Sequence, residues 1–431
     1  MQYLKNRWEL KESEDEYEAN VVNIYPEIER QKILGFGGAF TEAAAYMYSL
    51  MPAELKEKFM EACFGESGNR YSLGRVHMGS CDFALAPYSE SYRPDLSDFN
   101  IEQDKKYIIP MIRDALKKAG RKIFLLASPW SPPAFMKDTG ELNHAGKLKP
   151  EFYGTYAEYF AKFILAYRAE GIEISAVTVQ NEARAKQNWE SCRWTATEEA
   201  VFATNYLRPT LDKNGLQDVK IMIWDHNKER IMNRADESFS VPGAREAIWG
   251  MGYHWYSGEH FDNIALFREK YPEKEIIETE FCSESCGNFD DDKRTRYYAN
   301  EYIRSLRFGS AGLCDWNLLL NPAGGPYHWR QEPGGCSAAF YYDEEKKELI
   351  QDGIYGAINT VVSQLDPGDR VVATSAAKQN VPMVAVKKAD GTVILFVLNA
   401  SDEKLPVALR MGKKAGLFFL PPMSVSANTI C

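Results

Sequence analysis

The strongest constraint on the fold is a repeating alternation of apolar runs and helix-compatible segments between residues 32 and 317. The apolar runs are typical of strands buried on both faces. Eight runs are present, and eight parallel strands close a (β/α)8 barrel. An open, doubly wound sheet has the same pattern, so the alternation alone leaves both α/β architectures possible. The expected strands are 32–40, 73–78, 123–127, 177–182, 219–224, 251–256, 276–282 and 311–317.

The sequence changes character near residues 364–369, beyond which short alternating strands are separated by turn signals. Asp390 and Gly391 lie between two apolar runs, and Asp-Gly in that setting predicts a β-hairpin. We therefore expect two domains. A (β/α)8 TIM barrel covers residues 31–362, and a small antiparallel β-sandwich is built from residues 1–30 together with 363–431.

The overall charge excludes some classes of partner. A net charge of −10 and an isoelectric point near 5.4 argue against nucleic acid or an anionic membrane surface. No apolar run reaches the roughly 18 residues that a membrane span needs. The first residues lack the apolar centre of a signal peptide, so a cytoplasmic location is expected.

The cysteines and histidines do not predict a metal centre. The eight cysteines are scattered, and the nearest pair, Cys282 and Cys286, is a weak zinc signal without a second pair. The three glycines of residues 35–38 do not match the dinucleotide fingerprint and suit close backbone packing better. We expect free thiols, no metal and no cofactor.

Two carboxylates stand at the ends of expected strands. Glu182 ends the fourth strand and Glu280 ends the seventh, so in a closed barrel they face each other across the mouth. Paired carboxylates flanking a bond suit glycoside hydrolysis. Either residue could instead be a salt-bridge partner at the rim. Glu278 shares a strand with Glu280 and could itself be the functional group.

Other polar and aromatic residues are expected to converge on the same mouth. The aromatic content of 13%, with 9 Trp and 24 Tyr, suits a protein that stacks on sugar faces, although cores also use aromatics. Each residue also has a structural explanation, such as packing for the tryptophans and a buried ion pair for the arginine. The residues are Arg75, Asp82, Trp130, Asn181, Asp225, His254, Tyr256, Asp315, Trp316 and Asn317.

Several short blocks, taken in order, give the sequence a resemblance to a known family. They are 35–41, 75–83, 127–133, 179–182, 254–256, 279–282 and 315–322. Together they resemble glycoside hydrolase family 30, the glucosylceramidase-like group, from about residue 33 to 330. The resemblance implies a (β/α)8 barrel with a β-sandwich built from both chain ends.

The resemblance also implies roles for residues. Glu182 matches the general acid/base of a retaining mechanism and Glu280 matches the nucleophile, which favours Glu280 over Glu278. Tyr256 matches a tyrosine near the nucleophile. Four further positions match residues that hold the sugar, namely Asp82, Trp130, Asn181 and Trp316; His254, Arg75 and Asp225 are added as expected substrate-binding residues.

The sequence departs from the family pattern at two positions. Ala183 follows Glu182 where the family usually has proline, which leaves the path of residues 184–189 open. Glu278 stands where a small residue is more usual, and we expect it to pair with Arg75. Beyond residue 340 the resemblance fades.

The expected chemistry is double displacement through a covalent glycosyl-enzyme, with the pKa of Glu182 raised by the negative charge of Glu280. The expected substrate is a small β-glycoside or short oligosaccharide, cleaved from its end, with β-glucosides favoured over β-xylosides. A β-1,6-glucanase of the same family is an alternative. Another enzyme class with this fold is a barrel lyase or aldolase, which would need a metal cluster or a Schiff-base lysine at a strand end; the sequence indicates neither. A catalytically inactive carbohydrate-binding barrel is the alternative that is not an enzyme.

Overall fold

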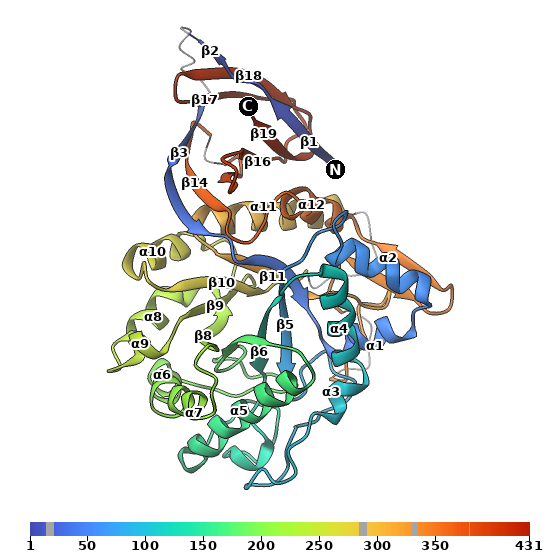
Figure 1. The fold of residues 1–431 in the computed structure, drawn as a ribbon, viewed down its shortest axis with the longest axis vertical. Helices are drawn as coiled ribbons and strands as arrows, with labels where there is room; N and C mark the ends of the chain where they lie inside the picture. The colour runs from blue at the N-terminus through green and yellow to red at the C-terminus, as the bar shows by residue number, and fades with distance from the viewer. Residues whose placement is uncertain (14–20, 284–290, 330–334, 379) are drawn as a thin grey trace.

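The structure is a computed structural model that describes residues 1–13, 21–283, 291–329, 335–378 and 380–431. Its larger part is a closed barrel of parallel strands in the order of the chain, with β11 pairing with β4 to close the ring (Figure 1). The predicted barrel is therefore confirmed, and the open sheet is excluded. Its strands are β4 (Gly35–Ala39), β5 (Leu73–Met78), β6 (Phe124–Pro129), β7 (Ile174–Thr178), β8 (Lys220–Asn227), β9 (Gly250–His254), β10 (Glu275–Glu280) and β11 (Gly312–Asn317).

The barrel strands are buried on both faces, which explains their nearly continuous apolar sequence. Every residue of β5 and of β11 is buried. Inside the barrel a small cluster that includes Leu73, Met222 and Ile277 fills the base. The much larger outer cluster packs the strands against the helices. Buried polar side chains such as those of Thr178, Asp225 and Glu280 lie toward the carboxyl ends of their strands.

The glycines of β4 allow close contact with the next strand, as the sequence predicts. A Cβ atom on Gly37 would lie 1.6 Å from the carbonyl oxygen of Leu73, so no larger residue fits there without moving β5.

The helices surround the barrel, and α1, α6, α11 and α12 begin at a side-chain cap. Thr41 caps α1, and Thr195 forms a capping box with Glu198 at the start of α6. The helices are α1 (Glu42–Leu50), α2 (Ala53–Phe64), α3 (Glu102–Lys106), α4 (Ile108–Ala119), α5 (Tyr153–Ala169), α6 (Ala196–Phe202), α7 (Arg208–Lys213), α8 (Ile231–Phe239), α9 (Ala244–Ala247), α10 (Asp262–Lys270), α11 (Asp292–Phe308) and α12 (Gly353–Val362). Single turns of 3-10 helix lie at Ala134–Met136, Pro150–Phe152 and Lys228–Arg230, and a π-helical turn lies at Ala203–Leu207.

Both ends of the chain contribute to the β-sandwich domain at the top of Figure 1. Its strands form one hydrogen-bonded, nine-stranded sheet in which β1 pairs in parallel with β19. The predicted hairpin at Asp390 and Gly391 is confirmed, since β15 and β16 pair antiparallel around it. The strands are β1 (Gln2–Trp8), β2 (Lys11–Glu12), β3 (Val21–Lys32), β14 (Arg370–Ala376), β15 (Met383–Lys387), β16 (Val393–Asn399), β17 (Leu405–Met411), β18 (Lys414–Leu420) and β19 (Ser424–Ile430).

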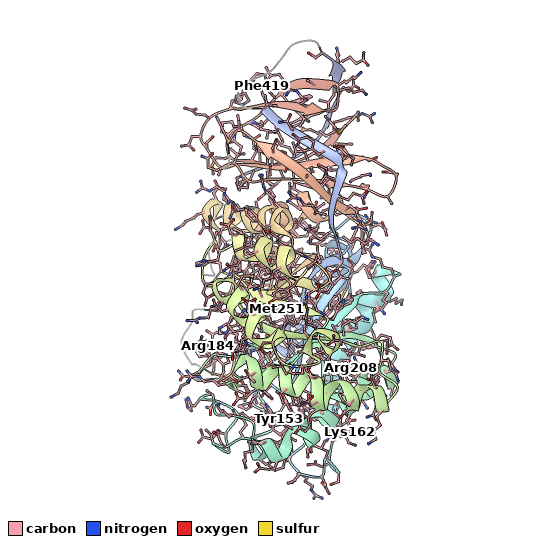
Figure 2. The ribbon with its side chains drawn as sticks, turned by 90° about the vertical axis from the view of Figure 1, so that its left-hand side faces the viewer. Tyr153, Lys162, Arg184, Arg208, Met251 and Phe419 are labelled. Carbon is pink, nitrogen blue, oxygen red and sulfur yellow. The ribbon has the colours of Figure 1, made fainter. Side chains whose placement is uncertain are left out.

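The sandwich packs on the barrel through alternate residues of its strands. In β16, Leu395 points into the core of the sandwich, whereas Phe396 belongs to the barrel's outer cluster. The helices α11 and α12 lie between the two parts (Figure 1). Figure 2 shows Phe419 at the far end of the sandwich and Tyr153 and Lys162 of α5 at the opposite end of the molecule. A separate hairpin, β12 (Phe340–Asp343) and β13 (Glu348–Gln351), precedes α12.

Among the described residues, no helix is long and apolar enough to cross a membrane. The described cysteines are free thiols, and Cys286, the second member of the weak zinc signal, lies outside the described residues.

Candidate active site

Glu182 and Glu280 line one cavity of about 430 Å³ at the carboxyl ends of the barrel strands. Glu280 is the last residue of β10, as predicted. Glu182 lies beyond the end of β7, which stops at Thr178, in a turn where its φ is 49°. That left-handed backbone is uncommon outside glycine, and a hydrogen bond of 2.8 Å from its amide to the carbonyl of Asp225 holds it there.

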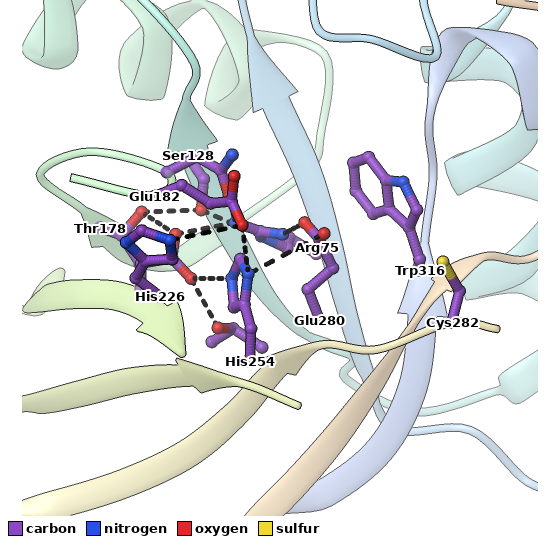
Figure 3. Close-up of polar contacts among 12 residues, drawn as sticks. Arg75, Ser128, Thr178, Glu182, His226, His254, Glu280, Cys282 and Trp316 are labelled. Atoms are coloured by element: carbon purple, nitrogen blue, oxygen red, sulfur yellow. Dashed lines mark hydrogen bonds and ion pairs between the residues drawn. The ribbon is translucent and has the colours of Figure 1, made fainter. Parts of the chain in front are cut away.

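The two carboxylates face each other across the ring of His254 (Figure 3). Nδ1 of His254 lies 3.6 Å from Oε1 of Glu182 and 3.9 Å from Oε1 of Glu280. Those two oxygens are therefore at most about 7.5 Å apart. Carboxyl groups of retaining enzymes are roughly 5–5.5 Å apart, which this limit allows. Those of inverting enzymes are about 6.5–9.5 Å apart, and the limit excludes the longer part of that range. The predicted convergence of the two glutamates is thus present in the structure.

Arg75 of β5 is the central cation of the site, and its side chain is fully buried. Its guanidinium donates to Oε2 of Glu280 at 2.6 Å, to Oδ2 of Asp225 at 2.7 Å and to Oδ1 of Asn181 at 2.8 Å. A buried arginine with several charge-assisted bonds fixes the groups around it. Arg75 therefore fixes Glu280 and Asn181 relative to each other.

Asp225 holds His254 and is itself anchored by two threonines. Thr178 donates to its Oδ2 at 2.7 Å and Thr279 to its Oδ1 at 2.5 Å, while Nε2 of His254 lies 3.1 Å from Oδ1. Burial opposes the charge of Asp225, but the charge of Arg75 and the bond to His254 bring its pKa below the usual range. Asp225 thus contacts the side of the His254 ring opposite the glutamates and, as an anion, orients that ring.

The protonation of the two glutamates differs from the expectation. Burial alone would raise the pKa of Glu182, but the imidazoles of His254 and His226 lower it to about 2. For Glu280, burial outweighs the charges of His254 and Arg75, and the pKa is raised. The expected rise in the pKa of Glu182 is therefore wrong for the unliganded protein. The expectation included the charge of Glu280 but not the effect of the imidazoles of His254 and His226 on Glu182. Burial lowers the pKa of His254, yet the charge of Glu280 and the bonds to Asp225 and Glu182 raise it to about 9.

Two stacked tryptophans form an aromatic wall of the cavity. The rings of Trp130 and Trp316 lie 5.2 Å apart at 19°, and the guanidinium of Arg75 lies 4.7 Å from the ring of Trp130. Such a wall suits the apolar face of a sugar ring. Tyr256 completes this side by donating to Oε1 of Glu280 at 3.0 Å.

Asp82 also lines the cavity and has an unsatisfied oxygen. Its buried Oδ1 has no hydrogen-bond partner among the described residues. Burial, followed by the negative charges of Glu280 and Glu182, raises its pKa well above the usual range. The unpartnered oxygen is therefore available for a hydrogen bond with a ligand hydroxyl.

Of the remaining candidates, two point away from the cavity. Asp315 bonds to Tyr298 and to the amide of Trp316, and Asn317 accepts from Thr41 at 2.6 Å. Both have the structural role that was the alternative explanation.

Glu278 does not pair with Arg75, and that expectation is wrong. Its Oε2 accepts from Ser305 of α11 at 2.8 Å and lies 3.4 Å from the hydroxyl of Tyr253, outside the barrel ring. The register of β10 on β9 shifts between Glu278 and Glu280, so the two residues no longer share a face. Burial and the charge of Glu301 raise the pKa of Glu278 well above its usual range.

The sequence reasoning missed several cavity residues, because they lie in loops or beside an irregular strand. His226 follows Asp225 directly, and strand alternation would have placed it outside. Gln187 and Trp189 come from the loop after Glu182, whose path was left open. The others are Phe83, Ala185, Asn227, Cys282, Tyr327, Trp329, Gly335 and Cys336.

The comparisons with known proteins cover both domains. Residues 33–336 match the glycosyl hydrolase family 30 TIM-barrel domain, and residues 369–427 match the glycosyl hydrolase family 30 beta sandwich domain. The lysosomal acid glucosylceramidase of Mus musculus is 30% identical over 413 residues, which are 90% of this chain and 79% of that protein.

Solved structures with the same two-domain fold include SrfJ from Salmonella typhimurium, with 31% identity and a TM-score of 0.92 over 96% of this chain and 93% of that one. The endo-β1,6-glucanase BT3312 has 27% identity and a TM-score of 0.86 over 94% of this chain and 93% of that one.

Proposed function

Because this chain belongs to glycosyl hydrolase family 30, we propose that it hydrolyses β-glucosidic bonds with retention of configuration, by double displacement. The observation that carries the proposal is that Glu182 and Glu280 both contact Nδ1 of His254, in a cavity lined by two stacked tryptophans. A carboxylate pair supplies the acid and the nucleophile that cleave a glycosidic bond, and the aromatic wall suits the apolar face of a sugar.

Glu280 is the proposed nucleophile. It attacks the anomeric carbon, and the leaving-group oxygen departs to give a covalent glycosyl-enzyme. Arg75 and Tyr256 each donate to a different oxygen of Glu280, which fixes the orientation of its carboxylate. These two donors also stabilise the free carboxylate when water releases the sugar.

Glu182 is the proposed general acid and base. It protonates the departing oxygen in the first step and removes a proton from the attacking water in the second. In the unliganded protein the pKa of Glu182 is lowered to about 2, whereas that of Glu280 is raised, so Glu182 is ionised before substrate binds. A productive complex therefore requires Glu182 to gain a proton, and His254, in contact with both carboxylates, is placed to pass one to it.

The favoured substrate is a β-glucoside cleaved from its end. The support is the likeness to a lysosomal acid glucosylceramidase over most of both chains. Asp82, Asn181 and the two tryptophans are proposed to hold the glucose ring, each from a position that lines the cavity. A second candidate is β-1,6-glucan, favoured by the likeness to the endo-β1,6-glucanase BT3312.

The proposal is tested with a panel of 4-nitrophenyl β-glycosides (glucoside, xyloside and fucoside) and with a β-1,6-linked glucan. Proton NMR of the first-formed sugar gives the configuration. We expect the glucoside to be the best substrate and the β-anomer to appear first. First appearance of the α-anomer would exclude the double displacement, and the absence of turnover on every glycoside would favour the inactive carbohydrate-binding barrel.

A further inference from the structure

A β-bulge at the end of β8 brings His226 into the cavity. Pairing with β9 runs from Trp224 opposite Gly252 to His226 opposite Tyr253, so Asp225 is an extra residue. Trp224 and Asp225 have φ angles of 73° and 47°, an unusual conformation for both residue types. Bulges redirect the side chains that follow them. Here the bulge turns Asp225 toward Arg75 and leaves His226 on the cavity wall.

His226 contacts the same oxygen of Glu182 as His254 does (Figure 3). Its Nε2 lies 3.7 Å from Oε1 of Glu182, and Nδ1 of His254 lies 3.6 Å from that atom. The other oxygen, Oε2, lies 3.5 Å from the amide nitrogen of Gln187. Contacts of this length in an unliganded site can shorten when substrate binds. The two imidazoles therefore enclose one oxygen of the carboxyl group and leave the second for the substrate.

The surroundings of His226 favour its neutral form. Burial lowers its pKa, while Glu182, Glu229 and Asp225 oppose that effect and His254 adds to it. The ring packs 5.1 Å from that of Trp224. Its buried Nδ1 has no hydrogen-bond partner in the described part of the chain. A neutral ring with its proton on Nε2 therefore presents that N–H to Glu182.

We propose that His226 is a positioning residue for Glu182, whose Nε2–H holds Oε1 so that Oε2 carries the proton given to the leaving group. The inference rests on the proposed role of Glu182 as general acid. It predicts that His226 matters most where departure of the leaving group needs a proton.

The test compares His226→Phe, which keeps a ring and removes the donor, with His226→Gln, whose amide can still donate. The control is His260→Phe, a change at an exposed histidine outside the cavity. The readouts are kcat/KM for phenyl β-glucoside and for 2,4-dinitrophenyl β-glucoside, the pH profile on each, and thermal melting of every variant.

For His226→Phe we expect a loss at least about tenfold greater on the phenyl glucoside than on the dinitrophenyl glucoside, whose departure hardly needs protonation. Loss of a donor to the carboxylate should also move the basic limb of the profile to higher pH by about half a unit or more. His226→Gln should recover most of both effects, and His260→Phe should match the unaltered protein.

Equal losses on both glucosides with an unmoved basic limb would make His226 a structural residue and overturn the inference. Unchanged rates on both would also overturn it. Glu182→Ala, measured on the same pair with and without azide, separates this failure from that of the proposed function. Glu182→Ala is expected to lose more activity on the phenyl glucoside than on the dinitrophenyl glucoside and to form a β-glucosyl azide. If it does so while His226→Phe loses equally on both glucosides, only the role of His226 is wrong. If Glu182→Ala itself shows neither effect, the acid/base assignment fails.

Discussion

At the scale of single residues, the arrangement around Glu280 gives a direct prediction. Replacing it with Gln keeps the size of the side chain and removes the nucleophilic carboxylate. We expect kcat on an aryl β-glucoside to fall by a factor of about 10⁴ or more, as happens when an enzyme loses its nucleophile. The measurement is the initial rate, with substrate binding followed by calorimetry. A variant that keeps near-normal turnover would show that another group forms the covalent intermediate.

Glu278 gives a prediction about stability and pH. Its pKa is raised in the folded protein, so the folded state binds a proton more tightly than the unfolded chain does. The contribution of Glu278 to the free energy of unfolding is therefore fully present below the ordinary glutamate pKa. It is lost as pH rises through the raised pKa of the folded state. Gln cannot ionise, so Glu278→Gln should gain in Tm relative to the unaltered protein as pH rises.

Between pH 5 and pH 8 the difference in Tm should move in favour of Glu278→Gln by about 1 °C or more, since each kcal/mol of stability corresponds to only a few degrees in a large domain. Differential scanning calorimetry at several pH values is the measurement. A difference that stays constant with pH would mean that Glu278 is not held neutral by its surroundings.

The positions of site residues were predictable from the sequence where a strand carries them. Glu280 ends β10 and Arg75 lies within β5, as the pattern of strands indicates. The orientation of Glu278 and the presence of His226 were not predictable, because register shifts in β10 and β8 break the alternation on which the reasoning depended. The protonation of Glu182 depends on imidazoles contributed by two other strands, which a linear sequence does not place.

At the scale of elements, the contact between β4 and β5 should tolerate no side chain at Gly37. Gly37→Ala would bring a methyl group against backbone atoms of Leu73, two residues before Arg75, and the strands would have to separate. We expect a loss of more than about 3 kcal/mol in the free energy of unfolding, with activity falling as Arg75 moves.

The matched control is Gly154→Ala in α5, where a Cβ would meet nothing within 4 Å. Alanine there should leave stability unchanged or raise it by up to about 1 kcal/mol. Urea unfolding of the two variants gives the comparison. Equal stability of both would contradict the close-contact explanation for the glycines of β4.

The elements themselves were well predicted, since all eight barrel strands lie within or beside the expected ranges. Their signal was strong because parallel strands buried on both faces need long apolar runs. The end of β7 was misjudged. The expected strand continued to Glu182, but β7 ends at Thr178, and residues 179–182 lead into the turn that carries Asn181 and Glu182 into the site.

At the scale of the whole molecule, the sandwich is packed tightly on the barrel. Phe396 is fully buried in the cluster shared with the barrel, whereas Phe419 at the far end is 50% exposed. Phe396→Ala should cost about 3–5 kcal/mol, and Phe419→Ala should cost far less. Thermal melting followed by both circular dichroism and loss of activity measures this. Equal effects of the two changes would mean that the domain contact adds little to stability.

The order of the sandwich strands limits when folding can finish. Because β1 pairs with β19, β1 cannot take its place in the sheet until β19 has been synthesised. Until then α12 lacks the cover that β1 and β19 give it, although every strand of the barrel has already been synthesised. A nascent chain that stalls before β19 would therefore expose an apolar surface to chaperones and proteases, so quality control at the sandwich would report on completion of both domains.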